Sequence, residues 1–220
     1  QKSVTRILAY SSIAQAGYIL IGIALAPYSD QALTGSLFHI INHAVMKSAG
    51  FIAAAAVATA LTTYSLERYK GLGRRMPITA IALSISLLAL AGVPPLNGFW
   101  SKLVLFGAAI NSGQIVAWGP YLAIAGVLNS ALSLGYYAWI IRKMYMEEGS
   151  DMSKIKEPRA MVAVLVFAMV FIVGFGIWHA PILGFASKAI PHLSNLTPTI
   201  STAVLTHTHP SIDLARQLTN

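Results

Sequence analysis

The sequence predicts an all-α membrane protein with about five transmembrane helices. Hydrophobic residues make up 56% of the chain and charged residues only 10%, whereas an ordinary soluble domain has about 25% charged residues. Five apolar segments are each long enough to cross a bilayer, which takes about 20 helical residues. They run approximately over residues 7–26, 33–61, 78–110, 121–141 and 160–183.

The charges between these segments alternate along the chain. The loop over residues 63–77 contains four Lys or Arg and the loop over 142–159 contains five, whereas the loops over 27–31 and 111–120 contain none. Positively charged loops are retained on the cytoplasmic side of a membrane. We therefore expect the N-terminus on the cytoplasmic side, or its topological equivalent, and the chain after residue 183 on the opposite side.

The charge and cysteine content exclude several other classes of function. The net charge of +8 is spread over short loops beside apolar segments, so we expect the lipid bilayer and not nucleic acid as a partner. The chain has no cysteine, which excludes disulfides, thiolate metal sites and cysteine-ligated iron–sulfur clusters within it.

The first and fourth segments carry weakly polar residues. In the first, small and polar side chains favour close approach of helices in lipid; they are Tyr10, Ser11, Ser12, Gln15 and Gly17. The fourth contains Asn129, Ser130 and Ser133. It ends with aromatic residues before two cations, which predicts an anchor in the headgroup layer; the aromatic residues are Tyr136, Tyr137 and Trp139.

The third segment is too long for one straight span. At about 1.5 Å per residue its 33 residues would extend about 50 Å, against a hydrocarbon core of about 30 Å. Near its middle stands GVPPLNGFWSK, from Gly92 to Lys102. Pro94 and Pro95 remove two amide donors, so we predict a broken helix there. Such a break within a membrane is tolerated where protein or water lines it. The break and the polar residues after it, Asn97, Gly98, Ser101 and Lys102, therefore indicate part of a hydrated path.

The second segment carries His39, His43 and Lys47 at intervals of four residues. In a helix these three residues line one face. Lys47 lies about 14 residues, or roughly 20 Å, into the span, which is too deep for its amine to reach the headgroups. Imidazole passes protons near neutral pH, and a lysine in low-dielectric surroundings gives up its proton more easily. The stripe therefore predicts a proton relay.

Other interpretations of these residues stay open. Lys102 could extend its amine to the headgroups. His39 and His43 could bind zinc, although no Asp, Glu or Cys on the same segment completes a site. Three further histidines, His179, His207 and His209, are expected to be structural. No predicted span contains a carboxylate, so a complete pathway must use residues outside this chain.

Three motifs resemble one known family. TRILAYSSIAQAGYILIG (5–22), FHIINHAVMKSAGF (38–51) and GVPPLNGFWSK (92–102) are similar to the second half of the antiporter-like proton-translocating subunits of respiratory complex I and its relatives. Within that family, NSALSLGYYAWIIRKMYMEE (129–148) is most similar to NADH-quinone oxidoreductase subunit N. The HIINHAVMK motif is also shared by subunits L and M and by antiporter subunits.

The resemblance implies a role for each candidate residue. Lys47 matches the central lysine of the half-channel, His39 and His43 match its histidine relay, and Lys102 matches the lysine near the outward exit. Residues 1–143 would form an antiporter-type half-channel, 144–159 a cytoplasmic-side loop, 160–183 the last transmembrane helix and 184–220 a loose or partner-bound tail. An earlier repeat is normal in the family, so we expect this chain to be a C-terminal fragment of a longer subunit.

The resemblance also implies partners and a location. We expect no cofactor in this chain; flavin, iron–sulfur clusters and quinone belong to partner subunits. The partners would be other membrane subunits and the missing N-terminal half, in the plasma membrane or an equivalent energy-converting membrane. Two alternatives remain: a subunit of a cation/proton antiporter or membrane-bound hydrogenase, and a scaffold whose lysines bind lipid or partner carboxylates.

Overall fold

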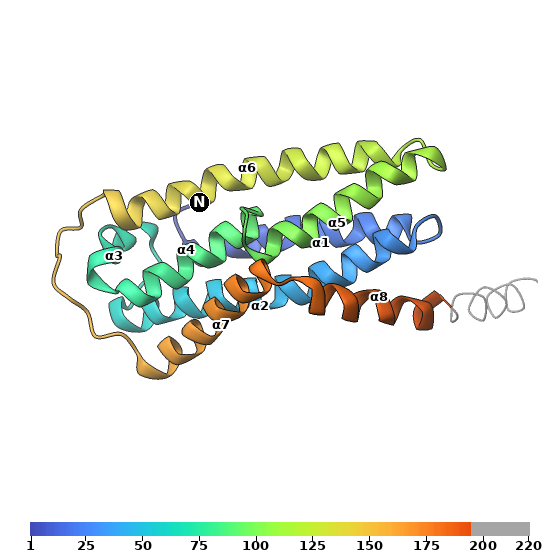
Figure 1. Cartoon of the computed structure of the whole chain (residues 1–220). Coiled ribbons are helices and arrows are strands. Elements are labelled where there is room, and N and C mark those ends of the chain that lie inside the picture. The colour runs from blue at the N-terminus through green and yellow to red at the C-terminus, as the bar shows by residue number, and fades with distance from the viewer. Residues whose placement is uncertain (195–220) are drawn as a thin grey trace, which may run out of the picture.

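The computed structural model describes residues 1–194 as a bundle of helices (Figure 1). Its longer helices are α1 (Val4–Leu25), α2 (Asp30–Leu61), α4 (Pro77–Ala91), α5 (Asn97–Asn111), α6 (Gly119–Met146), α7 (Arg159–Ile177) and α8 (Ala180–Ser194). Three short helical turns are η1 (Leu66–Tyr69), α3 (Leu72–Arg75) and η2 (Ser112–Gln114). The described part of the chain has no strand beyond one isolated bridge between Ser3 and Ser65, which confirms the all-α prediction.

Four of these helices, α1, α2, α6 and α7, are long and apolar enough to cross a membrane. The predicted third segment is divided into α4 and α5, each 15 residues long. At about 1.5 Å per residue, neither reaches across a core of about 30 Å. They follow one another along the bundle in Figure 1. The prediction of one broken span is confirmed, with the interruption at Gly92 to Leu96.

The last predicted span ends earlier than expected. Helix α7 stops at Ile177, and a separate helix, α8, begins at Ala180, so the boundary predicted at residue 183 is wrong and residues 184–194 are helical. Pro181 explains the interruption, because proline fits the first turn of a new helix but not the interior of a continuing one. The prediction for the rest of the tail, including His207 and His209, lies outside the described residues.

The junction between α7 and α8 packs on α5 through aromatic rings. His179 stacks on Trp100 with 4.0 Å between ring centroids. The Trp100 Nε1 donates a hydrogen bond of 2.6 Å to the Gly176 carbonyl, in the last turn of α7. These contacts agree with a structural role for His179.

Helix α2 is the centre of the bundle and contacts α1, α4, α5, α7 and α8. The largest core cluster joins the basic-loop end of α1 and α2 to α4, α6 and α7, and it includes Leu8, Met46, Leu83, Tyr137 and Ile172. A second cluster, which includes Tyr18, Leu25 and Leu105, joins α1 and α2 to α5 and α6. Polar side chains on the inner face of α2 are therefore enclosed by neighbouring helices on several sides.

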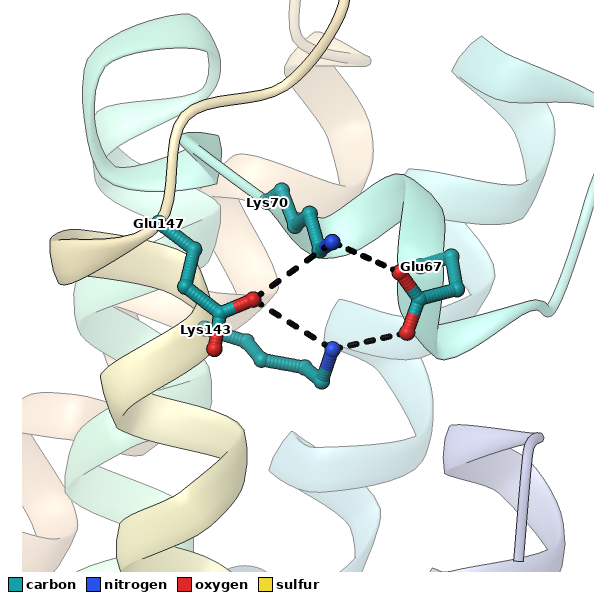
Figure 2. Close-up of polar contacts among 4 residues, drawn as sticks. All are labelled: Glu67, Lys70, Lys143 and Glu147. Carbon is teal, nitrogen blue, oxygen red and sulfur yellow. Dashed lines mark hydrogen bonds and ion pairs between the residues drawn. The ribbon is translucent and has the colours of Figure 1, made fainter.

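Both basic loops lie at the same end of the bundle. Four side chains join η1 to the end of α6 (Figure 2): Lys143 pairs with Glu67 at 2.7 Å and with Glu147 at 3.4 Å, and Lys70 pairs with Glu67 at 2.8 Å and with Glu147 at 3.6 Å. Lys143 is buried, and its Nζ lies 5.4 Å from the Trp139 ring centroid. This contact agrees with the prediction that the two loops face the same side of the membrane.

Acidification is expected to loosen this contact between η1 and α6. The hydrogen bonds from Lys143 and Lys70 lower the pKa of Glu67 from 4.5 to about 2. A carboxyl whose pKa is lower in the folded state stabilises it above the ordinary pKa, and loses this effect as the pH falls through the folded value. Hydrogen-exchange protection factors of residues 64–71 in the intact protein should therefore fall between about pH 4.5 and about pH 2.

The matched variants for this experiment are Glu67→Gln and Glu148→Gln. Glu67→Gln should lower protection at neutral pH and remove most of its dependence on acid. Glu148 is exposed and lies 3.7 Å from Arg74, so Glu148→Gln should behave as the unmodified chain does. Equal protection at neutral and acid pH in the unmodified chain would contradict the prediction.

Candidate functional site

Helix α2 places three of the predicted site residues on one inner face. His39 and Lys47 are buried, with 0% and 7% exposure, and His43 is half-buried between them. Lys47 follows His39 by eight positions, or about 12 Å along the helix axis. Since α2 runs from the uncharged loop before Asp30 toward the basic loop after Leu61, Lys47 lies closer to the basic end of the bundle than His39.

Lys47 is held by helix α1. Its Nζ donates to the Leu8 carbonyl at 2.8 Å and to Ser11 Oγ at 2.6 Å. Ser11 is also hydrogen-bonded to the Tyr137 hydroxyl of α6. Tyr137 is 0% exposed, so its predicted place in a headgroup anchor is wrong: the ring is in the core and its hydroxyl requires a protein partner.

The break in the third span leaves two carbonyls without helical donors. Helix α4 ends at Ala91, followed by Gly92 with a φ of +87°, which glycine readily adopts. In a continued helix, the carbonyls of Leu90 and Ala91 would accept from the amides four positions later. Those positions hold Pro94 and Pro95, which have no N–H.

Three side chains supply the missing donors. Lys102 Nζ donates to the carbonyls of Leu90 at 2.7 Å and Ala91 at 3.2 Å. Gln15 Nε2 donates to the Leu90 carbonyl at 3.1 Å, and Ser130 Oγ donates to the Ala91 carbonyl at 2.9 Å. Lys102 also donates to Ser130 Oγ at 2.8 Å.

Lys102 is enclosed near the break. It is 4% exposed, and its Nζ lies 5.0 Å from the Tyr18 ring centroid. A cavity of about 520 Å³ between α5 and α6 adjoins it, with mostly apolar walls that include Phe106 and Leu134. The amine points into the break, which contradicts the alternative in which it extends to the headgroups.

His39 connects α2 to α1 and α5. Its Nε2 lies 2.9 Å from Gln15 Oε1, and its Nδ1 lies 2.9 Å from Ser101 Oγ. Through Gln15 and the Leu90 carbonyl, His39 is connected to Lys102 by hydrogen bonds. Because protein partners occupy both ring nitrogens, neither is available to a metal, which disfavours the zinc alternative.

His43 lies on α2 between His39 and Lys47. Its ring is stacked with that of His39 at 6.1 Å between centroids and 16° between planes. Within residues 1–194, no direct hydrogen bond joins Lys47 and its partners Ser11 and Tyr137 to His39 and its partners Gln15 and Ser101. The structure therefore brings His39 together with Lys102 and attaches Lys47 to Ser11 and Tyr137.

The roles of Gln15 and Ser130 were not predicted from the sequence. Gln15 was expected to serve helix packing and Ser130 had no predicted role, yet both donate hydrogen bonds to the carbonyls freed by the prolines. The prolines themselves are a usable signal, since counting back four residues from each identifies Leu90 and Ala91. Which donors reach those carbonyls depends on helix packing.

The chain matches known proteins over most of its length. Residues 1–133 match the family described as "NADH:quinone oxidoreductase/Mrp antiporter, TM". F(420)H(2) dehydrogenase subunit N of Methanosarcina mazei is 41% identical over 199 residues, which cover 86% of this chain and 39% of the relative. NADH-quinone oxidoreductase subunit N 2 of Chloroherpeton thalassium is 36% identical over 192 residues, which cover 86% and 36%. The chain thus spans less than two fifths of the length of these relatives.

Solved structures of membrane complexes contain similar chains. An archaeal membrane-bound sulfane sulfur reductase has one that is 34% identical, with a TM-score of 0.73 over 87% of this chain and 37% of the other. A chain of respiratory complex I from Thermus thermophilus is 28% identical, with a TM-score of 0.62 over 84% and 40%. The Mrp complex from Dietzia sp. shares the fold, with 24% identity and a TM-score of 0.79 over 91% and 45%.

Proposed function

The chain belongs to the NADH:quinone oxidoreductase/Mrp antiporter transmembrane family, and we propose that it forms a proton half-channel in a complex I-type oxidoreductase. It is a multi-pass membrane protein, and its relatives include subunits N of NADH-quinone oxidoreductase and of F(420)H(2) dehydrogenase. In this proposal the redox chemistry, with its flavin, iron–sulfur clusters and quinone, takes place in partner subunits. This chain contributes the translocase part alone.

The observation that carries the proposal is the pair of buried amines, Lys47 and Lys102. Each is at most 7% exposed, and neither has an ion-pair partner among residues 1–194. A charged lysine at the centre of a bilayer costs about 3 kcal/mol on insertion scales. An amine whose charge is not neutralised locally is suited to losing and regaining a proton when charges in neighbouring subunits change.

The positions of the amines suggest the direction of transfer. Lys47 lies nearer the basic loops, and Lys102 lies on α5, which leads from the break toward the uncharged loop. We place the basic loops and the N-terminus on the cytoplasmic side, following the distribution of positive charge. A proton then passes from Lys47 past His43 to Lys102, which releases it outward.

The test is Lys47→Arg in the assembled complex, reconstituted in proteoliposomes. Arginine keeps the charge and donors of lysine but does not deprotonate in proteins. We expect the rate of proton translocation to fall by roughly tenfold, a barrier increase of about 1.4 kcal/mol. Lys154→Arg, at an exposed loop position, should have no effect. Unchanged translocation with Lys47→Arg would support the scaffold interpretation and refute the proposal.

A second candidate function is a cation/proton antiporter subunit without redox partners. The family description includes Mrp antiporters, and the same buried amines would serve either function. The subunit composition of the purified natural complex distinguishes the two functions. Copurified subunits with iron–sulfur clusters support the oxidoreductase, whereas small membrane subunits alone support the antiporter.

A further inference from the structure

We propose that Gln15 is a positioning residue that holds His39 in the tautomer with its proton on Nε2. This proposal rests on the proposed function of the site and changes the part that His39 plays in it. His39 would then take up and return a proton only at Nδ1, on the side of Ser101. His39 would therefore bind and release a proton at the same ring nitrogen, beside the path between the lysines. It would not pass a proton from one ring nitrogen to the other.

The orientation of the Gln15 amide follows from the Leu90 carbonyl. A carbonyl oxygen can only accept, so the amide group that faces it at 3.1 Å must be the donor Nε2. The reversed amide would place two oxygens against each other. Leu90 needs such a donor because Pro94, four positions later, has no N–H. The break in α4 therefore fixes which end of the Gln15 amide points to His39.

The tautomer of His39 follows from that orientation. Gln15 presents Oε1 to His39 Nε2 at 2.9 Å, and an amide oxygen can only accept. The ring nitrogen must therefore be protonated at Nε2, and the neutral ring keeps its lone pair at Nδ1. All three side chains involved, Gln15, His39 and Ser101, are at most 1% exposed, so bulk water does not compete for these bonds.

The Ser101 hydroxyl then has two possible acceptors. It lies 2.9 Å from His39 Nδ1 and 3.2 Å from the Gly98 carbonyl, and it has one hydrogen. When the ring is neutral, that hydrogen can satisfy Nδ1. When Nδ1 is protonated, the ring donates to Ser101 Oγ and the hydroxyl turns to Gly98. This side of His39 can accommodate both states without moving a helix.

At Nε2, by contrast, His39 has a partner that cannot switch between donating and accepting. Gln15 is neutral in both states and carries no titratable proton, so a proton leaving Nε2 has no acceptor that would pass it on. Gln15 nevertheless shares the Leu90 carbonyl with Lys102. A change in the charge of Lys102 therefore affects His39 through the Leu90 carbonyl and the Gln15 amide. The proton that His39 exchanges stays on the Ser101 side.

Nitrogen NMR on the histidine-labelled intact complex at rest tests the proposal. The His39 signals, assigned by their loss in His39→Asn, should show a protonated Nε2 and a bare Nδ1. In Gln15→Leu, Nε2 loses its acceptor, so the proton should move to Nδ1, where Ser101 can accept. Gln15→Glu restores an acceptor and should restore the proton on Nε2. Ser12→Ala, which removes a bond within α1 to the Leu8 carbonyl, should leave the tautomer unchanged.

Two results would overturn the proposal: a bare Nε2 in the unmodified complex, or an unchanged tautomer in Gln15→Leu. The tautomer is read without turnover, so it is independent of the pumping experiment. If Lys47→Arg pumps normally while the tautomer depends on Gln15, the proposed function fails and the positioning role stands. If Lys47→Arg blocks pumping while the tautomer ignores Gln15, only the positioning role fails.

Discussion

Replacing Lys102 with alanine is expected to abolish proton translocation by the complex while leaving the subunit folded. Without the amine, a proton moving past the break must exist as a charge in hydrocarbon, which costs about 3 kcal/mol on insertion scales. That corresponds to roughly a hundredfold slower proton step. The measurement is the proton-to-electron ratio in proteoliposomes, together with the rate of electron transfer.

The contacts around the break allow Lys102→Ala to remove the amine without leaving a buried carbonyl unpaired. The Leu90 carbonyl keeps its bond from Gln15, and the Ala91 carbonyl keeps its bond from Ser130. Neither carbonyl is left without a donor, so the large cost of an orphaned buried acceptor does not arise. Lys102→Arg adds a variant that keeps the charge but does not deprotonate, and it should fail as well.

The matched control is Lys188→Ala, at an exposed lysine on α8. It should translocate protons as the unmodified complex does. Normal translocation with both Lys102→Ala and Lys102→Arg would show that Lys102 takes no part in the path. Loss with alanine and normal translocation with arginine would point to a structural charge.

Replacing Gly98 with alanine is expected to prevent stable assembly of the subunit. Gly98 lies in the first turn of α5, where this helix meets α4. A Cβ atom at Gly98 would lie 2.0 Å from the Ala89 carbonyl oxygen and 2.9 Å from Met46 Sδ. The first neighbour is backbone and cannot rotate away. Overpacking of a core typically costs about 1–3 kcal/mol, and we expect at least the upper end here.

Gly107 provides the control on the same helix. A Cβ atom there would meet nothing within 4 Å, and alanine favours a helix interior by about 1 kcal/mol over glycine. Gly107→Ala should therefore assemble normally, whereas Gly98→Ala should lower both the amount of subunit in the purified complex and its unfolding temperature. Equal assembly of the two variants would contradict the close approach of Gly98 to the Ala89 carbonyl of α4.

Most of the fold could be predicted from local patterns. The apolar segments match α1, α2, α6 and the α4–α5 pair within a few residues at most boundaries, because a spanning segment must satisfy its own backbone hydrogen bonds within one helix. The end of α7 was misplaced because apolar residues resume after Ile177, at Ala180, Ile182 and Leu183, although Pro181 was a signal for a new helix start.

The candidate site was predictable only in part. Lys47 and Lys102 stand out because charged residues in apolar segments are rare and require a reason. Tyr137 was misassigned because aromatic residues before cations also occur at headgroups, and its buried contact with Ser11 depends on how α1 and α6 pack.

The sequence by itself determined which segments are helices, where the third one breaks and which polar residues lie at depth. These features depend on properties that are local in the sequence. They are the length of each apolar segment, the backbone N–H donors that proline lacks, and the free-energy cost of placing a charge in lipid. Only the tertiary structure decided the partners, because Gln15, His39 and the Leu90 carbonyl come from three different helices. Their hydrogen bonds depend on how those helices face one another, which no local pattern encodes.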